Sequence, residues 1–298
     1  MVKVAVHYST ATAELYRAGL IQIDCFKCPA WPDLVPSVQE ILPVYVHFSL
    51  KAGLGVGDAV ETGTNQPADW EKIEGLLAQT STPFINIHLS PTVTDHSHIP
   101  VDTTSPKHIE MLTEYLIKDV QAVVERFGTQ RVIVENDHSF AGVNLRPAFL
   151  PQVIGEVVQE TGCGLLLDLA HARLAATHLE MDVREYISSL PVAKVREVHV
   201  SGVQMVEGRW LELFRGFDNG LVERFAHKLL DHLPMTNEDW KLVEWSMQQI
   251  RDGKWSEPWV VAMECGGVSP LWELVTFKDV LEQQVPHLYT AVKGTIWE

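Results

Sequence analysis

The chain has 298 residues, of which 46% are hydrophobic, and a formal net charge of −16 from 23 basic and 39 acidic side chains. This length suits one large domain or two ordinary ones, and the apolar content is ample for a sizeable core. The negative field repels phosphate backbones, which weighs against a nucleic-acid binder. No apolar run reaches the roughly 18 residues that a membrane span needs.

The first residues, MVKVAVHYST, lack the charged start, apolar stretch and small-residue cleavage site of a signal peptide. They are better explained as a first strand, and we expect a soluble, cytoplasmic protein. The four cysteines are too few for a disulfide scaffold in a chain this long. Cys25 and Cys28 have the C-x-x-C spacing of redox and zinc motifs, but no second such pair follows. We therefore predict ordinary thiols there.

Eight short β-rich runs alternate with longer helical patterns. The best-marked helix is expected between Ser105, its N-cap, and Gly128, its stop, with Pro106 in the first turn. Strands too apolar to alternate, each followed by a helix, indicate a parallel sheet covered on both faces. Eight such units favour a single α/β domain over 1–298, a closed (β/α)8 TIM barrel, with an elaborated segment at 203–257. The strands are expected at 2–8, 20–26, 43–49, 84–90, 131–137, 164–171, 195–202 and 258–267.

Six of these runs have an imidazole or a carboxylate at or just before their carboxyl end, and His171 follows Asp168 by one short turn. In a parallel barrel the carboxyl ends converge on one rim, where the active site lies. The cost of burying so many ionisable groups is offset only by cations, so we predict a metal centre at this rim. The six residues are His47, His88, Glu135, Asp168, His199 and Glu264.

Each of these residues alone has an ordinary explanation. A histidine at a strand end is often a satisfied core or loop residue, Asp168 could cap the following helix, and Glu264 could pair with an arginine. One shared cause explains six strands better than six independent causes. Ligation by imidazole and carboxylate without cysteine suits iron, manganese or zinc, and Glu135 is the natural bridge between two ions.

Four further histidines carry a weaker signal. His96 and His98 lie on a polar loop after the fourth run and are expected to be solvated. His7 and His138 are possible rim residues without an assigned role.

The strand-end motifs, taken in order, resemble a known family. PVYVHFS, INIHLS, VIVEND, GCGLLLDLAHAR, EVHVSG and DHLPMT are similar to motifs of the DUF692 family, the multinuclear non-haem iron-dependent oxidases. That family belongs to the xylose-isomerase-like barrel superfamily, which also contains the zinc enzyme endonuclease IV. The resemblance implies a barrel with two or three irons, which use O2 to oxidise cysteine residues in ribosomally made peptides. Zinc or manganese are possible substitutes for the iron.

The resemblance also implies roles for single residues. Asp168 and His199 would be catalytic as well as ligands, and Asn136, which follows the bridging glutamate, would orient a ligand or substrate. The ligand set would be His47, His88 and Glu135 for one metal; Glu135, Asp168, His199 and Glu264 for a second; and His171 and His232, with Asp231 beside them, for a third.

Two departures from the family pattern fall on the third metal. The family usually has Asp-x-His before the P…DW motif, whereas Asp231 and His232 are adjacent here. Many members carry a histidine after the glycine of the seventh strand motif, where this chain has Val203. The sequence therefore predicts two tightly held ions and a weaker third.

Four functions compete. The first is an iron-dependent oxidase acting on a cysteine-containing peptide, with or without the separate recognition protein that some family members need. The second is a zinc-dependent phosphodiesterase like endonuclease IV, which the acidic charge disfavours because DNA binding needs a basic surface. The third is a sugar isomerase or epimerase, ranked lower because the predicted strand ends carry no lysine. The last is a metal-binding scaffold without activity.

Overall fold

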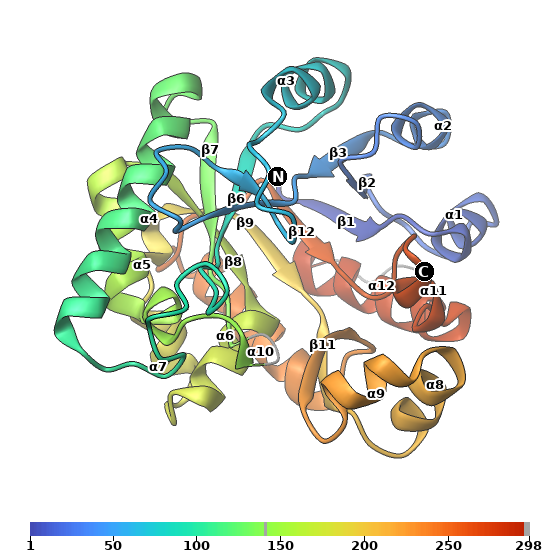
Figure 1. The fold of residues 1–298 in the computed structure, drawn as a ribbon. Helices are drawn as coiled ribbons and strands as arrows, with labels where there is room; N and C mark the ends of the chain where they lie inside the picture. The colour runs from blue at the N-terminus through green and yellow to red at the C-terminus, as the bar shows by residue number, and fades with distance from the viewer. Residues whose placement is uncertain (140–141, 295–298) are drawn as a thin grey trace.

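The computed structural model describes residues 1–139 and 142–294, which form a barrel of parallel strands surrounded by helices (Figure 1). The strand order is β3-β2-β1-β12-β9-β8-β7-β6-β4, with β5 antiparallel at the end. The predicted (β/α)8 TIM barrel is confirmed. The strands are β1 (Lys3–His7), β2 (Cys25–Pro29), β3 (Val44–His47), β4 (Leu50–Ala52), β5 (Val60–Glu61), β6 (Ile85–Leu89), β7 (Val132–Glu135), β8 (Gly164–Asp168), β9 (Val195–Val200), β10 (Gly202–Met205), β11 (Leu229–Leu233) and β12 (Val260–Met263).

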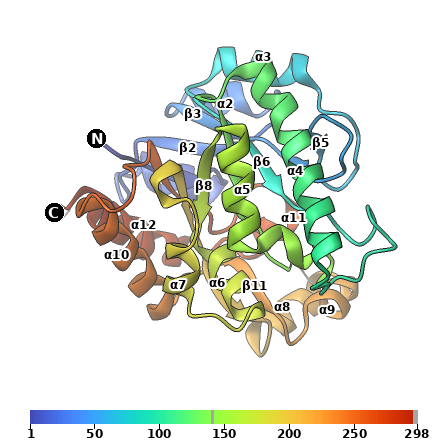
Figure 2. The same cartoon turned by 90° about the vertical axis from the view of Figure 1, so that its left-hand side faces the viewer.

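The helices pack around the outside of the strands, as the turned view also shows (Figure 2). The predicted signals hold for α4, which has Ser105 at its N-cap position, starts at Pro106 and stops at Gly128, where φ is 84°. The helices are α1 (Thr10–Arg17), α2 (Val35–Gln39), α3 (Trp70–Gln79), α4 (Pro106–Phe127), α5 (Pro151–Thr161), α6 (Leu169–His178), α7 (Val183–Ser188), α8 (Arg209–Phe217), α9 (Asn219–Phe225), α10 (Asn237–Arg251), α11 (Pro270–Leu274) and α12 (Lys278–Lys293), with short 3-10 helices η2 (Arg146–Phe149) and η3 (Val192–Lys194).

The barrel interior changes from apolar to ionisable along the strands. Side chains on a strand alternate between its two faces, so residues two apart point the same way. On β1, Ala5 belongs to an apolar cluster inside the barrel, and His7, two residues further on, lies at the rim. The same spacing relates Cys25 to Lys27, Tyr45 to His47, and Ala262 to Glu264.

The thiols of the C-x-x-C pair belong to the packing of β2, as predicted. Cys25 and Cys28 are free and buried. Burial raises the pKa of each thiol to about 12, so neither supplies a thiolate for redox chemistry or metal binding at neutral pH.

The second strand begins later than the sequence predicts. The apolar run 20–26 indicates a strand that the structure places at Cys25–Pro29, and pairing with β1 starts only at the first residue of β2. The preceding residues are a connection that packs against the core, with Ile21 and Ile23 only 3% and 5% exposed. Apolar character alone does not separate a buried strand from a buried approach to it. The shift brings Lys27 into the barrel.

Between β3 and β6 the barrel is closed by hydrogen bonds from one side chain, that of Asn86. β3 ends at His47, and the chain continues past Phe48 into β4, which pairs with β6. The Asn86 carboxamide on β6 accepts a hydrogen bond from Phe48 N at 2.7 Å and donates one to Phe48 O at 2.9 Å. Asn86 thus supplies the two hydrogen bonds that a neighbouring strand would give to this buried residue.

We expect Asn86→Ala to destabilise the fold by about 2–4 kcal/mol, because it leaves a buried backbone donor and acceptor unsatisfied. Denaturant unfolding of the metal-free chain measures this loss. Gln121→Ala, which removes an exposed amide on α4 that donates to Glu125, is the control and should cost less than ~1 kcal/mol. Equal losses in the two variants would contradict the closing role of Asn86.

The segment 203–257 holds a second small sheet at the edge of the barrel (Figure 1, orange). β10 pairs antiparallel with β11, and α8 and α9 lie between them in the chain. These elements have their own apolar cluster, which includes Trp210 and Phe214. The chain then enters α10, which leads to β12. Of all the helices in the described part of the chain, none is long and apolar enough to cross a membrane.

Candidate metal centre

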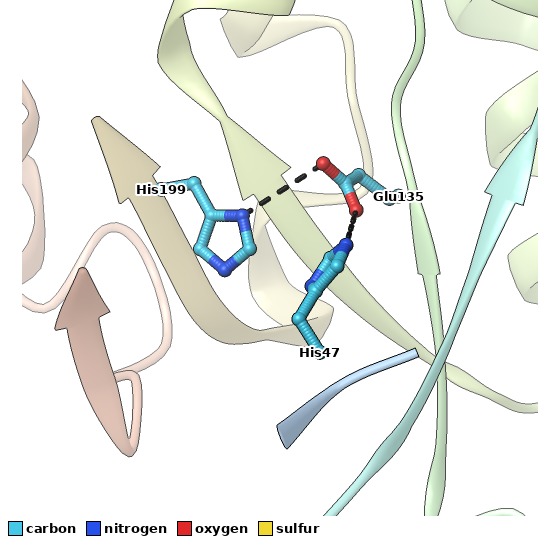
Figure 3. A group of neighbouring side chains, drawn as sticks. All are labelled: His47, Glu135 and His199. Atoms are coloured by element: carbon cyan, nitrogen blue, oxygen red, sulfur yellow. Dashed lines mark ion pairs between the residues drawn. The ribbon is translucent and has the colours of Figure 1, made fainter. Parts of the chain in front are cut away.

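Glu135, at the end of β7, lies in the middle of the rim and is 1% exposed. Its Oε2 atom lies 3.5 Å from His47 Nε2 and 3.4 Å from His88 Nε2. Its Oε1 atom lies 3.6 Å from His171 Nδ1 and 3.8 Å from His199 Nδ1. Figure 3 shows His47 and His199 reaching the carboxylate from two sides. The residue predicted as the bridge therefore faces histidines with both oxygens.

A second group forms around Glu264, which follows β12. The Oε1 atom of Glu264 lies 3.2 Å from His199 Nδ1. One ligand atom each from Asp168, His199 and Glu264 lies within 4.8 Å of the others. The second nitrogen of His199, Nε2, lies 2.7 Å from Glu197 Oε1, an arrangement that fixes the ring as carboxylates behind metal-bound histidines do. Glu197 is absent from the predicted site, although its position two residues before His199 places it on the same face of β9.

A third group lies beside β11. His171 Nε2 lies 3.1 Å from Asp231 Oδ2. The Nε2 atoms of His138 and His232 lie 3.8 and 3.7 Å from the same oxygen. His138, to which the sequence assigns no role, reaches this group from the loop after β7.

Asp231 and His232 both face the centre although they are neighbours in β11. Adjacent residues of a regular strand point to opposite faces. His232 has a φ of 56°, in the left-handed region that non-glycine residues rarely adopt, and this breaks the alternation. The ring of His232 is fixed by Nδ1, 3.0 Å from the Glu264 carbonyl oxygen. The adjacent pair thus brings to the centre the two residue types that Asp-x-His brings in the family pattern.

Asp168 is held in place from two directions. Asn136 donates from Nδ2 to Asp168 O and accepts from Asp168 N through Oδ1, both at 2.9 Å. The Asp168 carboxylate in turn accepts from His171 N at 2.7 Å, as the N-cap of α6. Asp168 is therefore the cap of α6, and its position also lies within reach of the groups that could hold an ion. Both the nitrogen and the oxygen of the Asn136 amide are hydrogen-bonded to the backbone of Asp168, so Asn136 orients Asp168.

Lys27 corrects the expectation that no lysine reaches the strand ends. It lies on β2, is 1% exposed, contacts Glu264 Oε1, and has its Nζ atom 3.4 Å from His199 Nδ1. Burial lowers the pKa of Lys27 to about 8, against the opposing effect of nearby carboxylates such as Glu135. The predicted second strand ends at residue 26, one residue before Lys27, so the prediction leaves Lys27 outside the strands. The expected absence of lysine, one of the grounds for ranking a sugar isomerase third, is therefore wrong; the abundance of histidines at the strand ends, the other ground, stands.

The other rim and loop histidines separate into two kinds. His7 joins the rim, with Nε2 3.5 Å from Glu264 Oε1 and Nδ1 3.0 Å from the Gly266 carbonyl oxygen. His96 is not solvated as expected: it is 6% exposed, because its Nε2 atom packs 2.7 Å from the Gly53 carbonyl oxygen.

The donor set fits cations. Glu135 Oε2 and Asp231 Oδ1 are buried atoms that lack a hydrogen-bond partner among the described residues. Burial raises the pKa of Glu135 to about 8, and it lowers the pKa of His47 well below its usual range. Buried anions and neutral imidazoles side by side are what a divalent metal ion stabilises, and nitrogen with oxygen donors suits iron, manganese or zinc.

We expect the stability of the metal-free chain to fall as the pH rises from about 7 to 8. Burial raises the pKa of Glu135 to about 8 and of Glu197 to about 7 from an ordinary 4.5. The folded chain then keeps protons that the unfolded chain has released, so a rising pH favours unfolding. His171 acts in the same direction, because Asp168 and other carboxylates raise its pKa against the effect of burial. Burial lowers the pKa of histidines such as His47 below an ordinary 6.5, which acts in the opposite sense, but mainly below about pH 7, where the unfolded histidines still bind protons.

Thermal melts in the presence of a chelator, at pH values across this window, measure the effect. Lys27 acts in the opposite sense only above about pH 8, where the folded chain has lost a proton that the unfolded chain keeps. A midpoint that rises between pH 7 and 8 would contradict the expectation.

A cleft opens beside the centre. Its volume is about 250 Å³, and Tyr8, Trp31 and Trp272 give it aromatic walls. Lys27 and His47 also line it. The cleft therefore connects the solvent to the rim residues.

Residues 29–251, about three quarters of the chain, match the model of a family described as "RiPP precursor modification enzyme MbnB/TglH/ChrH". RiPP denotes a ribosomally made and post-translationally modified peptide. The chain is 34% identical over 73 residues to a UPF0276 protein of Psychromonas ingrahamii, a match that covers 24% of this chain and 26% of that protein. It is 25% identical over 174 residues to a UPF0276 protein of Caulobacter vibrioides, covering 57% and 58%. The chain thus spans between about a quarter and three fifths of these relatives.

Solved structures of other proteins share the fold. D-psicose 3-epimerase from Clostridium cellulolyticum H10 matches with a TM-score of 0.53 and 12% identity over 99% of both chains. A xylose isomerase domain containing protein from Salmonella typhimurium LT2 matches with a TM-score of 0.54 and 14% identity, over 98% of this chain and 97% of that one. At these identities the likeness shows the fold alone, a xylose-isomerase-like TIM barrel.

Proposed function

This chain belongs to the family of RiPP precursor modification enzymes whose model it matches, and on that premise we propose that it is a non-haem iron-dependent oxidase. The proposed reaction uses O2 to modify a cysteine residue in a ribosomally made peptide. The observation that carries the proposal is the buried Glu135 carboxylate, which faces His47 and His88 with one oxygen and His171 and His199 with the other. A carboxylate in this position suits a bridge between two ions.

The groups described above define where two or three ions would be held. Iron would supply the change of oxidation state that the reaction needs. Zinc or manganese in the same site would show whether the site binds a metal ion, and zinc has no redox chemistry. The ligands proposed are His47, His88 and Glu135; Glu135, Asp168, His199 and Glu264; and His171, Asp231 and His232, with His138 added by its position beside Asp231.

The remaining polar residues of the rim keep these side chains in place. Glu197 accepts a hydrogen bond from one His199 nitrogen, and that bond directs the other nitrogen towards Glu135 and Glu264. Asn136 holds the end of β8, so Asp168 cannot swing away from the centre. Ligands fixed in this way before substrate arrives need no rearrangement during the reaction.

The cleft beside the centre is the proposed entry for the cysteine-containing peptide. Trp31 and Trp272 offer apolar faces to a peptide segment, and the substrate thiol would pass between them towards His47. The net charge of −16 favours a peptide with basic residues and disfavours nucleic acid. A separate peptide-recognition protein is a further proposed partner. We place the reaction in the cytoplasm, where ribosomally made peptides arise.

A sugar isomerase or epimerase is the second candidate, and Lys27 is the observation that favours it. Sugar enzymes of this barrel often combine carboxylates with a catalytic lysine, and Lys27 lies inside this centre. Its side chain contacts Glu264 and lies beside His199, so it is already paired within the ligand set. The family match supports the peptide more directly than the fold supports a sugar.

Co-expression with cysteine-bearing peptides encoded beside the gene tests the function by mass spectrometry. We expect the iron-loaded protein to change the peptide mass in air and not under anaerobic conditions. His199→Ala should abolish the change, and His287→Ala, at a side chain 46% exposed on α12, should retain it. An unchanged peptide mass, together with nicking of abasic DNA by the zinc-loaded protein or epimerisation of a ketose, would overturn the proposal.

A further inference from the structure

Lys27 occupies a position in the centre where a metal ion is otherwise expected. It extends from β2 towards Glu264 at the end of β12 and is 1% exposed. A lysine buried this deeply keeps its charge only beside an anion. Its contact with the Glu264 carboxylate provides that partner, and its Nζ atom lies 3.4 Å from His199 Nδ1.

We infer that the Lys27 side chain is a built-in cation at the group formed by Asp168, His199 and Glu264, and that it takes the place of one metal ion there. The inference rests on the proposed metal centre and replaces one of its ions, the one proposed at Glu135, Asp168, His199 and Glu264. The centre of this chain then holds two ions, one between His47, His88 and Glu135 and one at His171 and Asp231, instead of three.

Lys27 and a metal ion at this group would both bind the Oε1 atom of Glu264. Lys27 contacts this oxygen, and the same atom lies 3.2 Å from His199 Nδ1 and 3.5 Å from His7 Nε2. A metal ion held by His199 Nδ1 and this oxygen would lie about 2.0–2.2 Å from each, in the space beside them that the Lys27 ammonium occupies. The lysine and the ion therefore compete for one position.

The other carboxylates of the centre differ in this respect. Glu135 Oε2 and Asp231 Oδ1 are buried without a hydrogen-bond partner among the described residues, and Glu264 is not among these unpaired groups. A cation is thus still required at Glu135 and at Asp231, whereas Glu264 already has one. This distribution assigns the two remaining ions to the two carboxylates that keep a buried oxygen without a hydrogen-bond partner.

The number of ions per chain tests the inference without reference to catalysis. The full chain is loaded anaerobically with Fe(II) and, separately, with Zn(II), desalted, and analysed by mass spectrometry of the metals. We expect two ions in the wild type and three in Lys27→Met. Lys51→Met is the matched control, because Lys51 is a second buried lysine, paired with Asp95; its ion count should equal that of the wild type.

A second variant keeps the test decisive where Lys27→Met does not fold. Glu264→Gln should retain two ions under the inference, because the partner of Glu264 is Lys27 and not a metal; loss of one ion would overturn it. Three ions in the wild type, or no gain in a folded Lys27→Met, would also overturn it while the metal centre stands. A wild-type chain that binds neither Fe(II) nor Zn(II) would overturn the proposed metal centre together with the inference.

Discussion

Glu135→Gln is expected to lose metal and to reduce peptide modification by at least ~100-fold, because residues that merely stand behind metal ligands are already worth ~10–100-fold. Glutamine keeps the shape of the side chain and removes its charge. Since Oε2 faces His47 and His88 while Oε1 faces His171 and His199, both ions proposed around Glu135 should be weakened. Metal content after anaerobic loading and the rate of peptide mass change measure the two effects.

The same variant has a second expected result that separates loss of metal from misfolding. Burial raises the pKa of Glu135 to about 8, so above that pH the metal-free wild type carries an unfavourable buried charge that Glu135→Gln lacks. The metal-free variant should therefore unfold at a higher temperature than the metal-free wild type at pH 8. Asp239→Asn, at a buried carboxylate paired with Arg173 outside the centre, should keep its ions. Unchanged metal content in Glu135→Gln would end the bridging assignment.

Comparing Asp168→Asn with Asp168→Ala is expected to separate the role of Asp168 as a helix cap from its proposed role as a metal ligand. Asparagine caps a helix about as well as aspartate, whereas alanine costs about 0.5–2 kcal/mol. Asp168→Asn should thus unfold within ~1 kcal/mol of the wild type, and Asp168→Ala should be less stable by the value of the cap. Both variants lose the carboxylate charge, so both should lose at least ~100-fold in peptide modification.

Asp182→Ala is the matched control for the cap. Asp182 caps α7 by accepting from Arg184 N and Glu185 N, away from the centre. Its loss should lower the free energy of unfolding and leave the modification rate unchanged. If Asp168→Asn keeps full activity, the cap is the whole role of Asp168 and its place in the catalytic set is wrong.

The strand ends that carry the centre could be predicted because two regularities act together. Parallel strands in a barrel end at one rim, and alternation on each strand decides which side chain faces inward. Glu135, Asp168 and Glu264 lie far apart in the sequence, yet each comes at or just after the end of an apolar run that the structure shows to be a buried strand. Their convergence follows from topology and needs no knowledge of loop paths.

Lys27 and His138 could not be predicted, for different physical reasons. The run before Lys27 is mostly apolar, with Gln22 and Asp24 in it. A buried connection can have the same composition as a buried strand, so the sequence does not show where pairing starts. A lysine at the end of such a run is nevertheless a signal, because burial of an unpaired ammonium is costly. His138 lies in a loop, where no periodicity fixes the direction of a side chain. His232 faces the centre only through its left-handed backbone.

Because the barrel is closed between β3 and β6 by the Asn86 side chain, an ion bound beside this joint would also stabilise the closure. His47 ends β3 and His88 lies on β6, on either side of that joint, with their Nε2 atoms 3.1 Å apart. An ion bound by both rings would link β3 to β6. Separating the two strands would then require release of the ion, so metal release and strand separation would be coupled equilibria. The cleft that admits substrate is lined by His47 and Ser49 of this same wall. Loss of such an ion is therefore expected to weaken this joint, at the entrance for substrate, before the rest of the barrel.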